Sequence, residues 1–209
     1  MIKRFSPQSG VTLIELTLAT AIMSFMLLIL TTMFISLVHQ DRAAVSVRDS
    51  TQNTRYALDD ISREARRANT VQVIPAAGPA NFNQVCLYQD SAVVQYYVIP
   101  ATSGGRQILY RLTTPGAPAG AVCLRTVNPA GTPLTSPDLD VADFRVSAPM
   151  PASGIPIVTA RIGLTASLSD VLQRADGSYG CTNSASPYCS VTSIEASASL
   201  RGAQNNLNK

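Results

Sequence analysis

The feature that most constrains this chain is a long apolar segment near its start. Residues 17 to 38 carry no charge, and the only charged side chain between residues 11 and 38 is Glu15. About 20 apolar residues rising ~1.5 Å each cross the ~30 Å core of a bilayer. The segment therefore predicts a transmembrane helix over 11–38. A carboxylate at its mouth is costly in lipid and needs a partner. Since the run has no basic residue, we expect that partner on another molecule.

The helix is expected to continue well beyond the membrane. No proline occurs between Pro7 and Pro75, and no glycine between Gly10 and Gly78. The absence of both helix breakers favours one continuous helix over 12–69, with an amphipathic continuation over 39–69. Its expected apolar seam is Ala44, Val47, Thr51, Thr54, Leu58, Ile61, Ala65 and Ala68.

The charged residues of this second half, Asp60 and Glu64 among them, are expected on a solvated face. A coiled coil is the alternative use of the seam. Because the seam contains small and polar residues, we prefer packing against a sheet of the same chain. Leu58 and Ile61 are then the main anchors.

After residue 70 the pattern changes to short stretches with period two, bounded by glycine, proline, serine and asparagine. The predicted strands are 70–74, 84–89, 92–99, 107–112, 122–127, 141–147, 156–167 and 191–200. A turn at 103–106 is expected to join two of them as a hairpin, and 115–120, 128–137 and 169–190 are predicted loops. The expected fold class is α+β, with a mainly antiparallel sheet over 70–209 laid on the helix.

The distribution of charge indicates on which side of the membrane the domain lies. Lys3 and Arg4 in the leader, residues 1–10, mark the cytoplasmic end, so the domain over 70–209 is expected outside the cytoplasm. The net charge is only +3, which gives no electrostatic footprint for nucleic acid.

An even number of exported cysteines predicts disulfides. Four cysteines permit three pairings. We favour Cys181 with Cys189, which closes a short loop, and next Cys86 with Cys123. Buried free thiols remain the alternative for Cys86 and Cys123.

The first residues resemble a known signature. Gly10-Val11-Thr12-Leu13-Ile14-Glu15-Leu16 is similar to the type IV prepilin motif, in which a basic leader ends in glycine before an apolar helix with glutamate at its fifth position. The resemblance implies the type IV pilin fold. It also implies cleavage between Gly10 and Val11 by the prepilin peptidase, and N-methylation of Val11. Family members usually have phenylalanine where this chain has Val11.

The resemblance also implies a role for Glu15, which would pair with the new amine of a neighbouring subunit and set the offset between helices. The later part of the chain, with Gln107-Ile108-Leu109-Tyr110-Arg111-Leu112 and Val141-Ala142-Asp143-Phe144-Arg145-Val146, is similar to PilW-type minor pilins and J-type pseudopilins. The expected partners are the prepilin peptidase, other pilins or pseudopilins, and inner-membrane lipid. The expected location is the inner membrane, with the domain in the periplasm, and then a pilus or pseudopilus.

No enzymatic site is expected. The single histidine, His39, lies at the predicted outer membrane boundary, so no nucleophile-and-base set can be assembled. Asp138, Asp140 and Asp143 could suggest a cation site, but we expect them to be solvated. Tyr88, Tyr96, Tyr97 and Tyr110 fall on neighbouring strands and are expected to pack in the sheet, a ligand platform being the alternative.

No cofactor or metal is predicted. The expected function is that of a minor pilin, a structural subunit or assembly primer of a type IV pilus. One alternative is a type II secretion pseudopilin at the pseudopilus tip. A membrane-anchored binding module or enzyme that never assembles is the other.

Overall fold

A computed structural model describes residues 12–75, 82–99, 106–116, 123, 131–149, 156–166, 171–173, 179–182 and 191–200. The chain divides into two units, Met1–Asp41 and Arg42–Lys209. A single helix, α1 (Leu13–Arg67), runs through the boundary, in agreement with the helix predicted over 12–69. Basic Arg66 and Arg67 end it, where the helix dipole favours positive charge.

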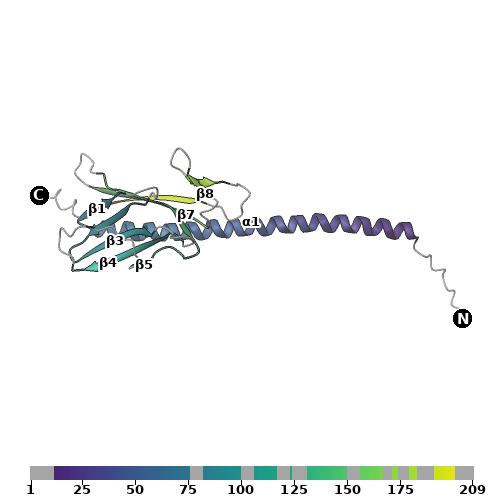
Figure 1. The fold of residues 1–209 in the computed structure, drawn as a ribbon, viewed down its shortest axis with the longest axis horizontal. Coiled ribbons are helices and arrows are strands. Elements are labelled where there is room, and N and C mark those ends of the chain that lie inside the picture. The colour runs from purple at the N-terminus through teal and green to yellow at the C-terminus, as the bar shows by residue number, and fades with distance from the viewer. Residues whose placement is uncertain are drawn as a thin grey trace, which may run out of the picture. The chain divides into compact units, whose positions relative to one another are not determined.

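The second unit is built on a five-stranded antiparallel sheet in the order β1-β2-β3-β4-β5. Its strands, drawn in Figure 1, are β1 (Thr70–Ile74), β2 (Gln84–Tyr88), β3 (Ala92–Ile99), β4 (Ile108–Pro115) and β5 (Thr132–Pro133). The predicted hairpin is confirmed, because Tyr97 pairs with Tyr110 and Val98 with Leu109. Its turn at 103–106 lies outside the described residues except for Arg106.

A second antiparallel sheet has the order β10-β7-β6, with strands β6 (Asp140–Ser147), β7 (Ile157–Thr165) and β10 (Thr192–Ser199). A bulge interrupts β6 between Val141 and Asp143. Residues that precede strands of the first sheet contact β6: Phe82, before β2, bridges to Phe144, and the Val141 amide donates to the carbonyl of Gln107, before β4, over 2.8 Å. A separate small hairpin joins β8 (Val171–Gln173) and β9 (Tyr179–Cys181).

Three strands contradict the predicted loops. We expected loops over 128–137 and 169–190, yet β5 lies in the first and β8 and β9 in the second. These strands are two or three residues long, too short for an alternating pattern to reveal. Gly131 permits β5, because a Cβ there would lie 2.3 Å from the Arg111 carbonyl oxygen. The strand predicted over 122–127 lies outside the described residues except for Cys123, which is not in a strand.

One hydrophobic core joins the helix to both sheets. Its members include Leu58 and Ile61 of α1, Val85 and Leu87 of β2, and Phe144 of β6. The α+β class and the packing of the helix on antiparallel sheets are therefore confirmed. By the transfer scale, burying each such side chain contributes about 1.5–3 kcal/mol.

The predicted helix seam is right only in its later part. Thr54, Leu58, Ile61, Ala65 and Ala68 are buried. By contrast, Ala44 and Val47 are exposed. Helix burial begins at Ser50, whose Oγ lies 2.9 Å from Oγ1 of Thr192 on β10. A helical repeat in the sequence shows which face is apolar but not where the covering sheet begins.

Candidate functional site

The start of α1 is closed by hydrogen bonds between two residues of the prepilin-like motif. The Glu15 carboxylate accepts from the Thr12 amide over 2.9 Å and from the Thr12 hydroxyl over 2.8 Å. The Glu15 amide donates back to Thr12 Oγ1 over 3.4 Å, and the Leu16 amide to the Thr12 carbonyl over 3.2 Å. Thr12 is thus the N-cap and Glu15 the third helical residue, which is the reciprocal arrangement called a capping box.

The sequence analysis missed this arrangement, although Thr-x-x-Glu before an apolar run is its known signature. The box gives Glu15 two donors from its own chain, and the helix dipole also favours a negative charge at this end. Both donors, the Thr12 amide and the Thr12 hydroxyl, are uncharged. Gly10 and Val11 lie outside the described residues, so their predicted cleavage and methylation remain predictions.

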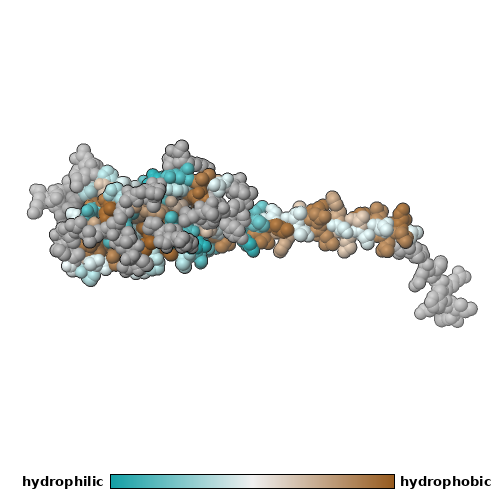
Figure 2. Space-filling model, in the orientation of Figure 1, coloured by the Kyte–Doolittle hydropathy of each residue, from teal (hydrophilic) through white to brown (hydrophobic). Residues whose placement is uncertain are grey.

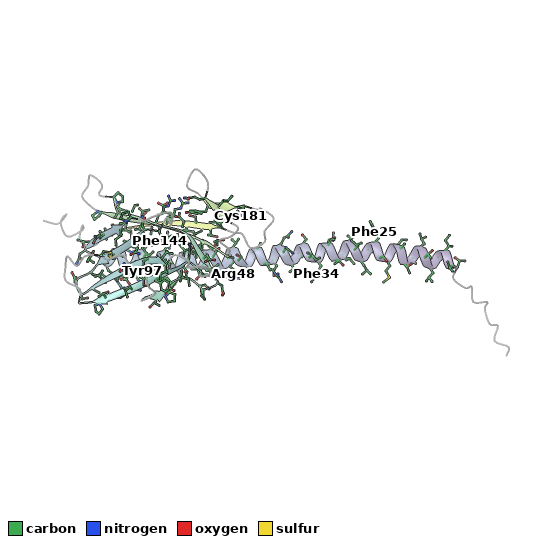
Figure 3. The ribbon with its side chains drawn as sticks, in the orientation of Figure 1. Phe25, Phe34, Arg48, Tyr97, Phe144 and Cys181 are labelled. Carbon is green, nitrogen blue, oxygen red and sulfur yellow. A yellow bond between two sulfur atoms is a disulfide. The ribbon has the colours of Figure 1, made fainter. Side chains whose placement is uncertain are left out.

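The first unit's part of α1 exposes its side chains over nearly its whole length. Every residue from 12 to 37 is exposed, including Phe25 and Phe34, which are 68% accessible. Figure 2 shows these residues as a mostly hydrophobic surface, and Figure 3 shows their side chains pointing outward around the helix. By length and composition this helix can cross a membrane. A single-pass membrane anchor near the N-terminus fits this finding.

Five hydroxyl groups within this apolar stretch form hydrogen bonds inside the helix. The side chains of Thr17, Thr20, Ser24, Thr31 and Thr32 each donate to a backbone carbonyl three or four residues earlier, over 2.7–3.0 Å. This bonding suits a medium without water, where every polar group needs an internal partner. It leaves Glu15 as the one charged group of residues 12–38.

A second set of acidic residues corrects the sequence analysis. Asp60 and Glu64 were expected on a solvated helix face, but both are buried, with 2% and 3% of their surface exposed. Arg111 of β4 reaches both, at 3.0 Å from Asp60 and 3.1 Å from Glu64. Arg63 also pairs with Asp60. The guanidinium fork can hold two carboxylates at once, which a lysine could not do as well.

Neutral groups complete this cluster. The buried Tyr96 hydroxyl donates to Asp60 over 2.8 Å, and the Gln89 amide donates to Glu64 over 2.7 Å. Burial, followed by the nearby Asp60 charge, raises the pKa of Tyr96 far above its usual value, so the phenol remains a donor. The cluster links α1 to the five-stranded sheet through the middle of the core.

Asp138, Asp140 and Asp143 do not form one solvated group. Asp138 is exposed, as expected, but Asp140 and Asp143 are buried, so the expectation was wrong for these two. Asp140 pairs with Arg106 at 3.5 Å and accepts from the Gln107 amide. Among the described residues, no cluster of histidine, cysteine and acidic side chains could hold a metal ion.

Asp143 lies between two arginines of the second sheet. Arg145 Nε donates to one carboxylate oxygen over 3.0 Å, and Arg161 Nε lies 3.3 Å from the other. Burial raises the pKa of the Asp143 carboxyl, against the opposing pull of Arg145 and then Arg161. These contacts are structural, because each group is already paired within the domain.

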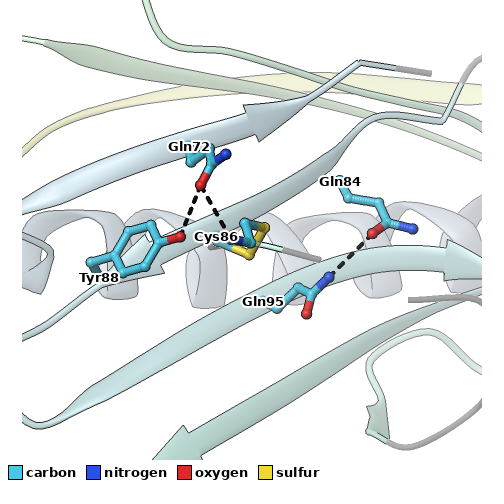
Figure 4. Close-up of a disulfide and its surroundings, with 6 residues drawn as sticks. Gln72, Gln84, Cys86, Tyr88 and Gln95 are labelled. Carbon is cyan, nitrogen blue, oxygen red and sulfur yellow. Dashed lines mark hydrogen bonds between the residues drawn. A yellow bond between two sulfur atoms is a disulfide. The ribbon is translucent and has the colours of Figure 1, made fainter. Parts of the chain in front are cut away.

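One of the two predicted disulfides is confirmed. Cys86 and Cys123 form a disulfide with their Cα atoms 6.0 Å apart, so the alternative of free thiols was wrong. Figure 4 shows Gln72 of β1 beside the disulfide, where its side-chain oxygen accepts from the Tyr88 hydroxyl and the Cys123 amide. Cys181 also belongs to a disulfide. Its predicted partner, Cys189, lies outside the described residues.

The histidine and tyrosines singled out in the sequence do not gather into one site. His39 is exposed on α1. Tyr97 and Tyr110 stack with ring centres 5.8 Å apart, and Tyr97 is fully buried, as expected for sheet packing. Among the predicted site residues that the structure describes, Glu15 is the one charged group on the exposed apolar stretch of α1.

Comparison with known proteins gave no match to any family model, curated protein or solved structure.

Proposed function

We propose that the chain is a type IV pilin-like subunit, most similar to a minor pilin, that is cleaved after Gly10 and enters a filament through its apolar helix. The observation that carries the proposal is the position of Glu15. Its carboxylate accepts a hydrogen bond from the Thr12 amide, one residue from the amine that cleavage would create at Val11. It is also the one charge of residues 12–38.

In this proposal the capping box holds Glu15 at the helix end in a fixed orientation, while the neighbouring subunit supplies the missing positive charge. Each group alone is costly in hydrocarbon, and the pair neutralises both. Only one axial offset between two such helices brings the amine to the carboxylate, so the pair also selects the register.

The location follows from the same argument. The helix anchors the subunit in the inner membrane, with the domain in the periplasm until assembly. The Cys86–Cys123 disulfide supports an oxidising compartment for the domain. In this proposal, the partners are the prepilin peptidase and other pilins.

Processing is tested directly by mass. The full chain is expressed with and without an active prepilin peptidase, and the intact mass and N-terminal sequence are determined. We expect loss of residues 1–10 and a methylated Val11 only when the peptidase is active. A chain that keeps its leader beside an active peptidase would overturn the proposal.

Assembly is tested with three variants that separate charge from capping. Glu15→Gln removes the charge but keeps a side chain that can close the capping box. Glu15→Ala removes both, and Thr12→Ala weakens the box but keeps the charge. Sheared filaments and membranes are probed for the protein. We expect both Glu15 variants to reduce its filament fraction more than about tenfold, because an unpaired charge remains in lipid.

Thr12→Ala should assemble far better than Glu15→Gln. The reverse order would show that Glu15 acts as a cap and not as a charge partner. Membrane levels of all three variants should stay unchanged. The filament in which the protein is found, pilus or pseudopilus, separates the minor pilin from the type II secretion pseudopilin.

A further inference from the structure

The two sheets end in strands that differ in how they are protected against pairing. Natural edge strands are kept from adding another strand by charges, prolines or short length. β5 has two residues and contains Pro133, β10 carries Glu195, and β6 carries two aspartates and an arginine. β1, with the sequence Thr-Val-Gln-Val-Ile, has five residues, no charge and no proline. It is thus the least protected of these edges.

The outer side of β1 carries main-chain groups that no described strand uses. Successive residues of a strand direct their N–H and C=O groups to alternate sides, and β1 pairs on one side with β2 from Thr70↔Tyr88 to Ile74↔Gln84. In the described part of the chain, no strand pairs with its other side. The β-branched composition also suits an extended strand.

A groove of about 400 Å³ lies beside this edge. Val71 and Val73 of β1 form one wall, and Ala148, Pro156 and Leu200 face them. The far wall is braced by hydrogen bonds from the Leu200 amide to Pro156 and from the Ile157 amide to Pro149. Among its described lining residues no side chain is charged, so a charged group entering it would lose hydration without gaining a partner.

We propose that β1 is a docking edge for an extended, uncharged segment of another polypeptide, which adds as a further strand. Main-chain hydrogen bonds to β1 would hold the segment, and its alternate apolar side chains would enter the groove. This is the recognition mode called strand addition, in which the edge provides affinity and the pocket selects side chains. The inference does not depend on the pilin proposal, because it uses only contacts of the second unit.

The test uses the full chain in detergent and a capped peptide of alternating threonine and valine as the probe. Binding is measured by titration, and its location by amide hydrogen exchange. We expect saturable binding that slows exchange within Thr70–Ile74. A matched peptide with one N-methylated central residue lacks a main-chain donor and should bind about tenfold more weakly.

Two threonine-to-lysine variants provide the matched comparison. Thr70 lines the groove and Thr132 lies on the opposite edge strand of the same sheet, and both are exposed, so both variants should fold. Thr70→Lys should weaken peptide binding at least about tenfold, by the same edge-protecting effect that natural lysines have. Thr132→Lys should leave it unchanged.

The proposal is overturned if the wild-type chain shows no saturable binding, or if Thr70→Lys and the N-methylated peptide bind as well as their parents. Binding that appears only after removal of residues 201–209 would assign the groove to the chain's own C-terminal segment instead. Dimerisation of the wild-type chain that Thr70→Lys abolishes would assign it to a second copy.

Discussion

The carboxylates in the two halves of α1 differ in burial and in the charge of their partners. In the first half, Glu15 is exposed, and its described contacts are uncharged groups of Thr12. In the second half, Asp60 and Glu64 are buried and share Arg111 from a strand. A folded domain that buries a carboxylate provides its own positive charge, whereas the described residues of the apolar half, 12–38, provide none. In the proposed function, a neighbouring subunit provides that charge.

The largest change in stability is expected when Arg111, which Asp60 and Glu64 share, is replaced. Arg111→Met would leave Asp60 and Glu64 buried with only Arg63 and Arg67 as described cationic partners, and both of these side chains are largely exposed. Breaking a buried ion pair costs about 3–5 kcal/mol, so the free energy of unfolding should fall by that amount. Urea denaturation measures it. Arg66→Met, on the exposed face, is the control and should change little. Equal stability of the two variants would show that Arg111 does not hold the carboxylates.

Loss of the disulfide comes next. Replacing Cys86 and Cys123 by alanine removes a link across 37 residues, and the chain-entropy estimate gives a loss of about 3–4 kcal/mol. The melting temperature of the double variant, compared with the oxidised wild type, measures the effect. It should affect only the domain, and the helicity of the first half should remain. A wild-type melting temperature that reductant leaves unchanged would argue that the bond is not formed in solution.

Tyr96→Phe sharpens the comparison at Asp60. Loss of a hydrogen bond to a charged group should cost about 1.5–3 kcal/mol at neutral pH. The pKa of Tyr96 is higher in the folded state than its unfolded value of about 10. The tyrosine therefore contributes stability below a pH of about 10. That stability is lost as the pH rises from about 10 toward the pKa of the folded state. Denaturation between pH 9 and 11 should show a shallower alkaline decline for the variant. Parallel curves would contradict the assigned pKa shift.

Asp143→Asn tests a paired carboxylate whose contribution to stability should change with pH in the direction opposite to that of an ordinary salt bridge. Because the folded state raises the pKa of Asp143, it binds more protons than the unfolded state just above the usual value of about 4. The contribution of Asp143 to stability should therefore fall as the pH rises through that window. The stability difference between wild type and variant, followed from pH 4 upward, should shrink. A growing difference would mean that Arg145 and Arg161 outweigh burial.

The smallest effect is expected from Glu15→Ala on the domain. Glu15 is exposed and its described side-chain contacts are with Thr12, so the unfolding midpoint of the domain should not move. The same variant is expected to be severely defective in filament assembly. A measurable loss of domain stability would remove the distinction between the two halves on which the comparison depends.

Much of the fold could be read from local pattern. The long stretch without glycine or proline predicted α1 to within two residues at each end, and alternating residues predicted β1 and β3 at their observed bounds. The apolar run and Glu15 were also visible at once, because hydropathy and the position of a lone charge are properties of adjacent residues. The proposed function still depends on that local pattern.

Only the tertiary structure decided which polar residues are buried. Asp60 and Glu64 look like surface residues of a mixed-charge helix, and Asp140 and Asp143 look like a loose acidic group. Their arginine partners include Arg111 of β4, Arg161 of β7 and Arg106, which precedes β4. Periodicity along one helix or strand cannot show which distant residues will cover it. The physical reason is that burial of a charge is decided by a partner far away in sequence, while helix and strand formation are decided by near neighbours.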